Sequence, residues 1–377
     1  MKYFDYRAPD GDPKKNAKVS AVGFGGMRFP VKEDKSIDFE AASALIDRAY
    51  EAGINYYDTA YPYHGGTSET FFAEALKKYP RDSYYLADKL PIWLLESADD
   101  VERIFNEQLE RCNTDHFDFY LCHAMSAKRL EALEQFSVLE TLEKLRSEGK
   151  IVRLGFSFHD TPEALDKVLS AHKWDFAQIQ YNYLDYTMQD AKGQEEVLNR
   201  HGVPFLIMEP VRGGALVNVP EKAAKLLSES GEGSVPSYAM RFALSANGVF
   251  CALSGMKDSL ALEDNIKTCT DFSTVSEDER KLLAKVADII IAARLVPCTE
   301  CRYCDGCPSG IDIPALLKLY NGFMTTEDKK TLRAEVDKLS ARPVSCISCG
   351  ACTSVCPQHI DIPATMQTLA KLTEKRQ

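Results

Sequence analysis

The stretch DFEAASALIDRAYEAGINYYDTA, residues Asp38–Ala60, contains one complete unit of a pattern that recurs along most of this chain. Its first part places apolar residues at three- and four-residue spacing, which predicts an amphipathic helix, and INYYDTA is a short β-rich run. Similar units continue from about Val19 to Ile290. The candidate strands are VSAVGFGG, INYYDTA, YYLADKL, FDFYLCHAM, RLGFSFH, FAQIQYN, VPFLIMEP and FCALSGM.

The number of these units distinguishes a closed barrel from an open sheet. A doubly wound open sheet also alternates strands and helices, but eight uninterrupted units over roughly 250 to 290 residues favour a (β/α)8 barrel of parallel strands. The motif G-x-G-x-x-G does not follow the first strand. GFGGMR at Gly23–Arg28 therefore predicts a tight strand end rather than a phosphate-binding loop.

The composition changes abruptly at Val296, which marks a second domain. Two related blocks follow, CTECRYCDGCPSGIDIPALL and CISCGACTSVCPQHIDIPATM, and the sequence between them has a helical period. This internal duplication predicts a small, mainly helical domain. We expect the barrel at residues 1–292 and the second domain at residues 293–377.

Charge and cysteine content restrict the function classes. The formal net charge is −11, and the sequence contains no basic block that could neutralise phosphates. Both observations argue against a nucleic-acid partner. The first twenty residues lack the apolar core of a signal peptide, and no stretch has the apolar run of a membrane helix. We expect a cytoplasmic protein whose twelve cysteines stay reduced and serve mainly to bind metal rather than to form disulfides. Four stand alone and are expected in the core: Cys112, Cys122, Cys251 and Cys269.

The other eight cysteines form two iron–sulfur motifs. The second block follows the C-x2-C-x2-C-x3-C-P spacing of bacterial clusters, with Cys346, Cys349, Cys352 and Cys356. The first block is one residue shorter before its last cysteine and contains Cys298, Cys301, Cys304 and Cys307. Zinc is the alternative, although zinc favours two separated cysteine pairs over triplets at this spacing.

Eight thiolates suffice for two 4Fe–4S clusters, and the motif also predicts how they are shared. In two-cluster proteins of this pattern, the fourth cysteine of each motif ligates the other cluster. One cluster would therefore use Cys298, Cys301, Cys304 and Cys356. The other would use Cys346, Cys349, Cys352 and Cys307.

Polar side chains occur at the ends of three consecutive predicted strands of the barrel. Asp58 ends the second strand, which runs on to Tyr63; Lys89 ends the third and His123 the fourth. Singly, these could be a helix cap, a surface aromatic, a rim charge and a core imidazole. Together they are hard to explain as packing, because barrel interiors favour branched apolar side chains and barrel active sites lie at the strands' carboxyl ends. They predict an active site.

In these motifs the chain resembles the aldo-keto reductase family. The matching stretches are YYDTAYPY, LADK, FDFYLCH and EGKIVRLGFS, in the family's order, and the resemblance covers roughly Val19 to Ile266. It implies reduction of a carbonyl by a nicotinamide cofactor, with Tyr63 as general acid. Lys89 would lower the pKa of the phenol, and Asp58 would hold Lys89 charged and oriented. His123 would donate to the substrate oxygen or complete a proton relay.

The resemblance also implies the cofactor contacts. Ser157 and Gln178 would hold the carboxamide, although Phe158 replaces the family's usual asparagine, and Met208 replaces the usual stacked ring. The stretch expected at the pyrophosphate contains Glu209, Arg212, Gly213 and Gly214; a turn leading into a helix, with a surface arginine, is its alternative. The expected adenosine-side contacts are Gly255, Met256, Lys257, Asp264 and Asn265. Ala261 takes the family's arginine position, so the choice between NADH and NADPH stays open.

A barrel of this type followed by an α-helical ferredoxin-like tail resembles an iron–sulfur branch of the same family. The leading hypothesis is an NAD(P)H-dependent oxidoreductase for a carbonyl or quinone-like substrate, with the tail for electron transfer. Clusters move single electrons and nicotinamides move pairs, so a connection needs a flavin, a substrate that accepts single electrons, or an electron-carrier protein.

Two alternatives remain from the sequence alone. The clusters could be purely structural in a carbonyl reductase, or the chain could be a non-catalytic electron carrier or redox sensor. The substrate depends on the loops PIWLLESADD, which contains Trp93, and AMSAKRLEALEQ.

Overall fold

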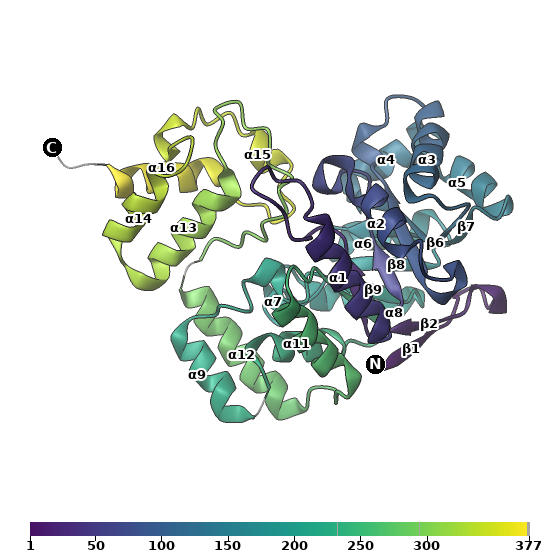
Figure 1. The fold of residues 1–377 in the computed structure, drawn as a ribbon, viewed down its shortest axis with the longest axis horizontal. Helices are drawn as coiled ribbons and strands as arrows, with labels where there is room; N and C mark the ends of the chain where they lie inside the picture. Colours follow the sequence, from purple (N-terminus) through teal and green to yellow (C-terminus); the bar gives the residue numbers. More distant parts are fainter. Residues whose placement is uncertain (232, 294, 375–377) are drawn as a thin grey trace. The chain divides into compact units, whose positions relative to one another are not determined.

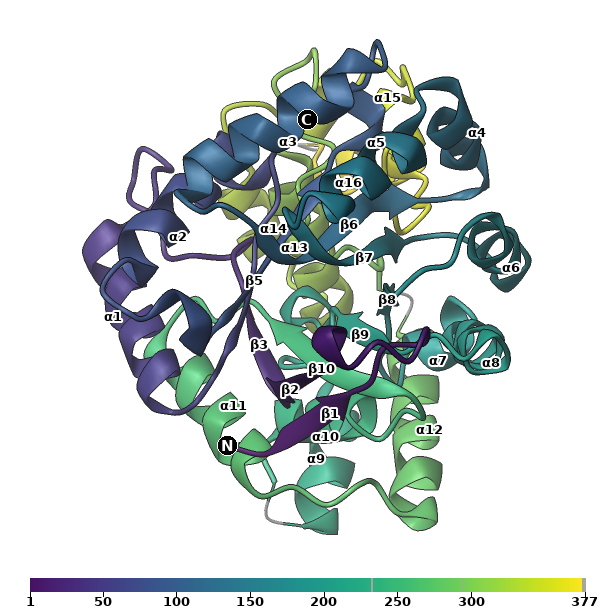
Figure 2. The ribbon, with the colours of Figure 1, turned by 90° about the vertical axis from the view of Figure 1, so that its right-hand side faces the viewer.

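The computed structural model describes residues 1–231, 233–293 and 295–374 of the chain. Within them, eight parallel strands close into a barrel in the order β10-β3-β4-β5-β6-β7-β8-β9. Figure 2 shows these strands as a ring with helices outside it. The predicted (β/α)8 barrel is confirmed. The barrel strands are β3 (Val22–Gly25), β4 (Tyr56–Asp58), β5 (Tyr85–Leu90), β6 (Phe117–Met125), β7 (Ile151–Phe158), β8 (Phe176–Gln180), β9 (Phe205–Met208) and β10 (Val249–Ser254).

Some of the helices between and after the strands begin at a side chain that accepts a hydrogen bond from a free N–H group of the first turn. Asp38 accepts from Ala41 N at the start of α1, and Asp258 accepts from Ala261 N at the start of α11. The helices up to the end of the barrel are α1 (Phe39–Glu51), α2 (Ser68–Leu76), α3 (Asp99–Cys112), α4 (Ala127–Gln135), α5 (Val138–Ser147), α6 (Pro162–Ala171), α7 (Asp185–Met188), α8 (Ala191–His201), α9 (Glu221–Ser230), α10 (Val235–Ala243), α11 (Ser259–Thr270) and α12 (Glu277–Ala292).

An antiparallel hairpin of β1 (Tyr3–Tyr6) and β2 (Ala17–Ser20) lies at the amino end of the barrel (Figure 2). Tyr6 is 1% exposed, and its ring packs edge-on against Phe119 and Phe250, with centroids 5.8 and 5.0 Å away. The expectation of a single strand over VSAVGFGG was wrong, because β2 ends at Ser20 and β3 begins at Val22. One half of that run belongs to the hairpin and the other half to the barrel.

The described chain forms two compact units, Met1–Pro210 with Pro236–Glu277, and Val211–Val235 with Asp278–Gln377. The second unit contains an apolar core of its own, formed among others by Leu316, Val336 and Leu369. Its helices after α12 are α13 (Ile313–Thr326), α14 (Lys329–Val336), α15 (Ala351–Ser354) and α16 (Ile362–Thr373), labelled in Figure 1. The mainly helical tail is thus confirmed, and the boundary between residues 292 and 293 stays a prediction.

The isolated cysteines of the first unit are all buried, as expected for core residues: Cys112, Cys122, Cys251 and Cys269. Burial raises the pKa of the Cys269 thiol to about 12. None of the helices in the described part of the chain is long and apolar enough to cross a membrane.

Because β7 and β8 pack closely at Gly155, adding one methyl group there should lower the stability of the fold. A Cβ atom on Gly155 would stand 2.5 Å from the carbonyl oxygen of Phe176, whereas on Gly25 its nearest neighbour would be Ser254 O at 3.5 Å. We expect Gly155→Ala to lower the free energy of unfolding by about 1–3 kcal/mol, because the backbone of β8 cannot move aside. Gly25→Ala should change it by less than about 0.5 kcal/mol. Urea unfolding of both variants measures the difference, and equal stability would contradict this packing.

Candidate active site and metal centre

Lys89, near the end of β5, forms a buried ion pair with Asp58 at the end of β4. Its Nζ donates to Asp58 Oδ1 and to the carbonyl oxygen of Thr59, both at 2.6 Å. Lys89 is 1% exposed and Asp58 is 3% exposed. Burial raises the pKa of the Asp58 carboxyl, and the Lys89 ammonium opposes this rise. The pair is stable in this setting because each charge compensates the desolvation of the other.

Tyr63 and His123 complete the group predicted from the sequence. Tyr63 begins the short 3-10 helix η2 (Tyr63–Gly66), and the Lys89 Nζ lies 4.9 Å from the centroid of its ring. The ring meets that of His123 edge-on, with centroids 6.0 Å apart. The structure therefore brings the four side chains together at the carboxyl ends of β4, β5 and β6.

His123 is buried in an irregular part of β6. The register with β7 shifts between Cys122 and Met125, and Ala124 has a φ of 55°, which is uncommon for a residue other than glycine. Burial lowers the pKa of the His123 imidazole well below its usual range, and the positive charge of Lys89 acts in the same direction. The imidazole is consequently neutral near pH 7, when one ring nitrogen carries a proton and the other is an acceptor.

Trp93 stands beside this group, on the loop that the sequence named as a candidate pocket wall. Its ring centroid is 5.0 Å from that of His123, and the guanidinium of Arg129 lies 5.1 Å from the Trp93 ring. Trp93 is 38% exposed. A partly exposed ring therefore lies next to the buried His123 imidazole.

Side chains that the sequence analysis did not select hold the backbone of Lys89. Asp88 Oδ1 accepts from the N–H of Lys89 at 2.8 Å, and Gln108 Nε2 donates to its carbonyl oxygen at 3.1 Å. Tyr120 donates to Gln108 Oε1 at 2.5 Å. Burial raises the pKa of the Asp88 carboxyl well above its usual range, and the charge of Glu69 adds to the effect. The sequence signals for this support are a glutamine among the apolar positions of α3 and an aspartate within β5.

Ser157 and Gln178, expected at the carboxamide, are paired across β7 and β8. Ser157 Oγ accepts from the N–H of Ala124 at 2.7 Å, so this hydroxyl also fixes the backbone after His123. A serine hydroxyl also carries one proton that it can donate. Gln178 Oε1 is buried and has no hydrogen-bond partner in the described part of the chain. A hydroxyl donor and a buried amide oxygen side by side fit a carboxamide, which needs one of each.

Arg28, which was quoted in GFGGMR without a role, contacts residues expected to bind the cofactor. Its Nη2 lies 3.2 Å from Glu209 Oε1, and its side chain passes within 2.9 Å of the place where Gly255 would carry a Cβ. Met208 ends β9 directly before Glu209. The ion pair joins the segments that follow β3 and β9, a long-range contact that no local pattern indicates.

The adenosine-side candidates fall on and before α11. Met256 is buried, Lys257 is exposed and Asp264 is partly exposed. Asn265 is buried and donates to Ser254 Oγ at 2.9 Å.

Arg212 and Gly213, which were expected at the pyrophosphate, belong to the second unit, where they contact the cysteine region.

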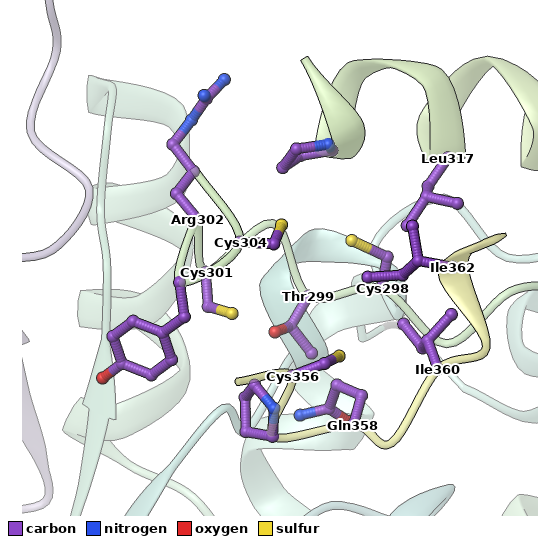
Figure 3. A pocket seen from close by; sticks show the side chains of 13 residues that line it. Cys298, Thr299, Cys301, Arg302, Cys304, Leu317, Cys356, Gln358, Ile360 and Ile362 are labelled. Carbon is purple, nitrogen blue, oxygen red and sulfur yellow. The ribbon is translucent and has the colours of Figure 1, made fainter. Parts of the chain in front are cut away.

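The eight motif cysteines line two separate cavities in the second unit. One cavity is lined by Cys298, Cys301, Cys304 and Cys356, and Figure 3 shows their sulfur atoms around the same space. The other is lined by Cys307, Cys346, Cys349 and Cys352. Each set combines a triplet from one block with the last cysteine of the other block, as the sequence predicts. Apolar side chains complete both linings, among them Leu317, Ile360 and Ile362 in the first.

The two blocks also share a sequence of left-handed backbone conformations. Positive φ angles occur at Glu300 and Arg302 of the first triplet, and at the matching Ser348 and Gly350 of the second. Further along, Gly310 and His359 match in the same way. When right-handed and left-handed residue conformations alternate, successive backbone N–H groups point into one concavity. Such concavities bind anions, including iron–sulfur clusters. Both blocks then begin a helix at the aspartate of IDIP, which accepts a hydrogen bond from the helix.

Cluster ligands differ in spacing from the ligands of a single ion. Among the residues that the structure describes, no three His, Cys, Asp or Glu side chains are grouped closely enough to hold one metal ion. In a cubane cluster each thiolate binds a different iron, so its ligands surround a larger space. Four thiolates can hold either a zinc ion or a cluster. The C-x2-C-x2-C triplets, each joined by the last cysteine of the other block, fit a cluster.

Family models match both parts of the chain. The aldo/keto reductase family model matches residues 21–288. The chain belongs to this family. A model of the 4Fe-4S dicluster domain matches residues 297–360, so an iron–sulfur domain follows the barrel of this aldo/keto reductase. Family membership makes the chain an NAD(P)-dependent oxidoreductase.

Individual relatives resemble this aldo/keto reductase over part of its length. L-galactose dehydrogenase of Arabidopsis thaliana is 28% identical over 292 residues, covering 70% of this chain and 89% of that protein. The NADH-specific methylglyoxal reductase of Escherichia coli is 28% identical over 203 residues, covering 48% of this chain and 59% of that protein. The holo form of an aldo-keto reductase from Bacillus halodurans has a TM-score of 0.63 at 24% identity and covers 76% of this chain and 96% of its own.

The buried ion pair predicts a strongly non-additive pair of substitutions. Lys89→Met leaves the Asp58 carboxyl buried without its cation and should lower the free energy of unfolding by about 3–5 kcal/mol. Adding Asp58→Asn removes the remaining charge and should restore part of this loss. Urea unfolding of the two single variants and the double variant measures the coupling. Additive losses would show that the two charges do not compensate each other.

The buried imidazole predicts how stability depends on pH. The pKa of His123 is depressed in the folded state, so the unfolded state binds the proton more readily. The stabilisation is complete above the ordinary histidine pKa of about 6.5 and is lost as pH falls below it. Relative to His123→Gln, the wild type should lose about 1.4 kcal/mol per pH unit there. The exposed His201, changed to Gln, is the control. Parallel stability curves for wild type and His123→Gln would contradict the burial effect.

Proposed function

We propose that this aldo/keto reductase reduces a carbonyl or quinone-like small molecule with NADPH or NADH, with Tyr63 as the general acid. One observation carries the proposal: the Lys89 Nζ lies 2.6 Å from Asp58 Oδ1 and 4.9 Å from the centroid of the Tyr63 ring. A phenol gives up its proton reluctantly, and a neighbouring cation favours the phenolate that remains.

The bound nicotinamide would supply a hydride to the carbonyl carbon, and the carbonyl oxygen then needs one proton. Tyr63 donates this proton from its hydroxyl, and Lys89 stabilises the resulting phenolate. Asp58 keeps Lys89 charged and in place. His123, being neutral, orients the substrate oxygen by donating one N–H without adding a charge. One hydride and one proton convert a carbonyl into an alcohol, so the step is balanced.

The proposed cofactor contacts lie at the nicotinamide and along the rest of the dinucleotide. Ser157 and Gln178 would hold the carboxamide. The buried Gln178 Oε1 supports this role, because it has no hydrogen-bond partner among the residues that the structure describes. Met208 would cover the nicotinamide ring. The remaining proposed contacts are Glu209, Arg212, Gly213, Gly255, Met256, Lys257, Asp264 and Asn265. A solved aldo-keto reductase of Klebsiella pneumoniae, with a TM-score of 0.61 at 20% identity, contains NADPH, and the Escherichia coli relative is named as NADH-specific.

The tail would hold two 4Fe–4S clusters on the two cysteine sets and use them for electron transfer. The pairing of triplets with fourth cysteines at the two cavities supports this assignment. Because clusters move single electrons, a flavin, a substrate that accepts single electrons or an electron-carrier protein would connect them with hydride chemistry. The cytoplasmic location is proposed from the sequence alone.

A tyrosine substitution tests the barrel's chemistry. Tyr63→Phe removes the proton donor and should lower kcat/KM for reduction of small aldehydes, ketones or quinones by about 10²–10⁴-fold. Tyr61→Phe removes a nearby hydroxyl that donates to Glu107 at 2.8 Å and should retain activity. Full carbonyl reduction by Tyr63→Phe would favour a redox sensor or electron carrier instead.

An anaerobic titration with NADH and NADPH tests the role of the tail. Cluster absorbance and paramagnetic resonance are followed while released flavin is assayed. Bleaching of the clusters by either nucleotide would show electron transfer between the two parts of the chain. Unchanged clusters in an enzyme that reduces carbonyls would identify them as structural or as dependent on a separate carrier.

A further inference from the structure

A buried arginine contributes to the wall of the first cysteine cavity. Arg212 begins the 3-10 helix η5 (Arg212–Gly214) and is 3% exposed. Its Nη2 donates to Gln358 Oε1 at 3.4 Å. Gln358 lines the first cavity and follows Cys356 by two residues, as Figure 3 shows. One hydrogen-bonded side chain thus stands between the guanidinium and the cavity.

The backbone beside Arg212 packs directly on the first cysteine triplet. A Cβ atom on Gly213 would stand 2.3 Å from the carbonyl oxygen of Thr299, so only glycine permits this approach. Thr299, between Cys298 and Cys301, is consequently 2% exposed. Arg212 itself has a φ of 50°, a conformation that costs energy in residues other than glycine. The loop is held in this strained form against the triplet.

The duplicated block provides an internal comparison. Ile347 matches Thr299 in the second triplet, and it is 67% exposed. Cys349 matches Cys301 and is exposed, whereas Cys301 is partly buried. Equivalent positions therefore face different surroundings. The first triplet is covered by the Arg212–Gly214 segment, and the second triplet faces solvent at these positions.

We infer that Arg212 is a positioning residue of the first iron–sulfur site that favours the reduced state of its cluster. The inference rests on the proposed function, which assigns a cluster to Cys298, Cys301, Cys304 and Cys356. A cluster held by four thiolates is an anion, and taking up one electron makes it more negative. The residues that cover the site exclude water, which makes reduction of the cluster less favourable. A buried positive charge nearby makes reduction more favourable again.

The test is a potentiometric titration of the anaerobic protein with dithionite and mediators, followed by paramagnetic resonance and without nucleotide. Arg212→Gln should lower one of the two cluster potentials. We expect at least a tenfold smaller ratio of reduced to oxidised cluster at a fixed potential, which corresponds to about 59 mV for one electron. The other potential should stay unchanged. Arg212→Lys keeps the charge and should shift the same potential less.

Two further variants control for position and folding. Arg302 lines the same cavity with a side chain that is 47% exposed, and Arg302→Gln should have a smaller effect because water screens its charge. Gly213→Ala keeps Arg212 but displaces its loop, and it should move the same potential as Arg212→Gln.

Iron and sulfide content separates the outcomes. Unchanged potentials in both Arg212→Gln and Gly213→Ala, at wild-type iron and sulfide content, would overturn the inference and leave the proposed function standing. A wild-type protein without iron and sulfide would refute the cluster assignment itself, and with it this inference.

Discussion

The buried ion pair between Lys89 and Asp58 is the constraint on which the barrel's active site depends. Two opposite charges can be kept almost free of water only if each remains within hydrogen-bond distance of the other. This requires β4 and β5 to be neighbours in a fixed register, and it requires Asp88 and Gln108 to hold the backbone of Lys89. The positions of the aromatic side chains around the ammonium follow from these supports.

In the iron–sulfur domain, the charged groups that are shielded from water would be cysteine thiolates instead of an ion pair. Bound clusters would place negative charge in an apolar setting, and backbone N–H groups in the left-handed turns would compensate it. The duplicated blocks form two cysteine cavities with the same turns, but the surroundings of the two cavities differ. Thr299 is covered and Ile347 is exposed, so two sites of common origin need not behave alike.

Much of this architecture could be predicted from the sequence, because it depends on local patterns. Periodicity predicted the barrel, and cysteine spacing predicted which cysteines share a cavity. The N-terminal hairpin was missed because VSAVGFGG is apolar throughout, which hides the break at Ala21. The contact of Arg28 with Glu209 and that of Arg212 with Gln358 join residues far apart in the chain, so no short motif encodes them. The roles of the cofactor contacts remain predictions.

The hairpin at the amino end of the barrel also affects how the chain is made. Tyr6 precedes all the barrel strands in the chain, yet its aromatic partner Phe250 lies in β10, the last barrel strand to be synthesised. The barrel's amino end therefore cannot be filled during most of translation. An apolar surface stays open until β10 emerges, and this interval is when the nascent protein is most exposed to aggregation and most in need of a chaperone.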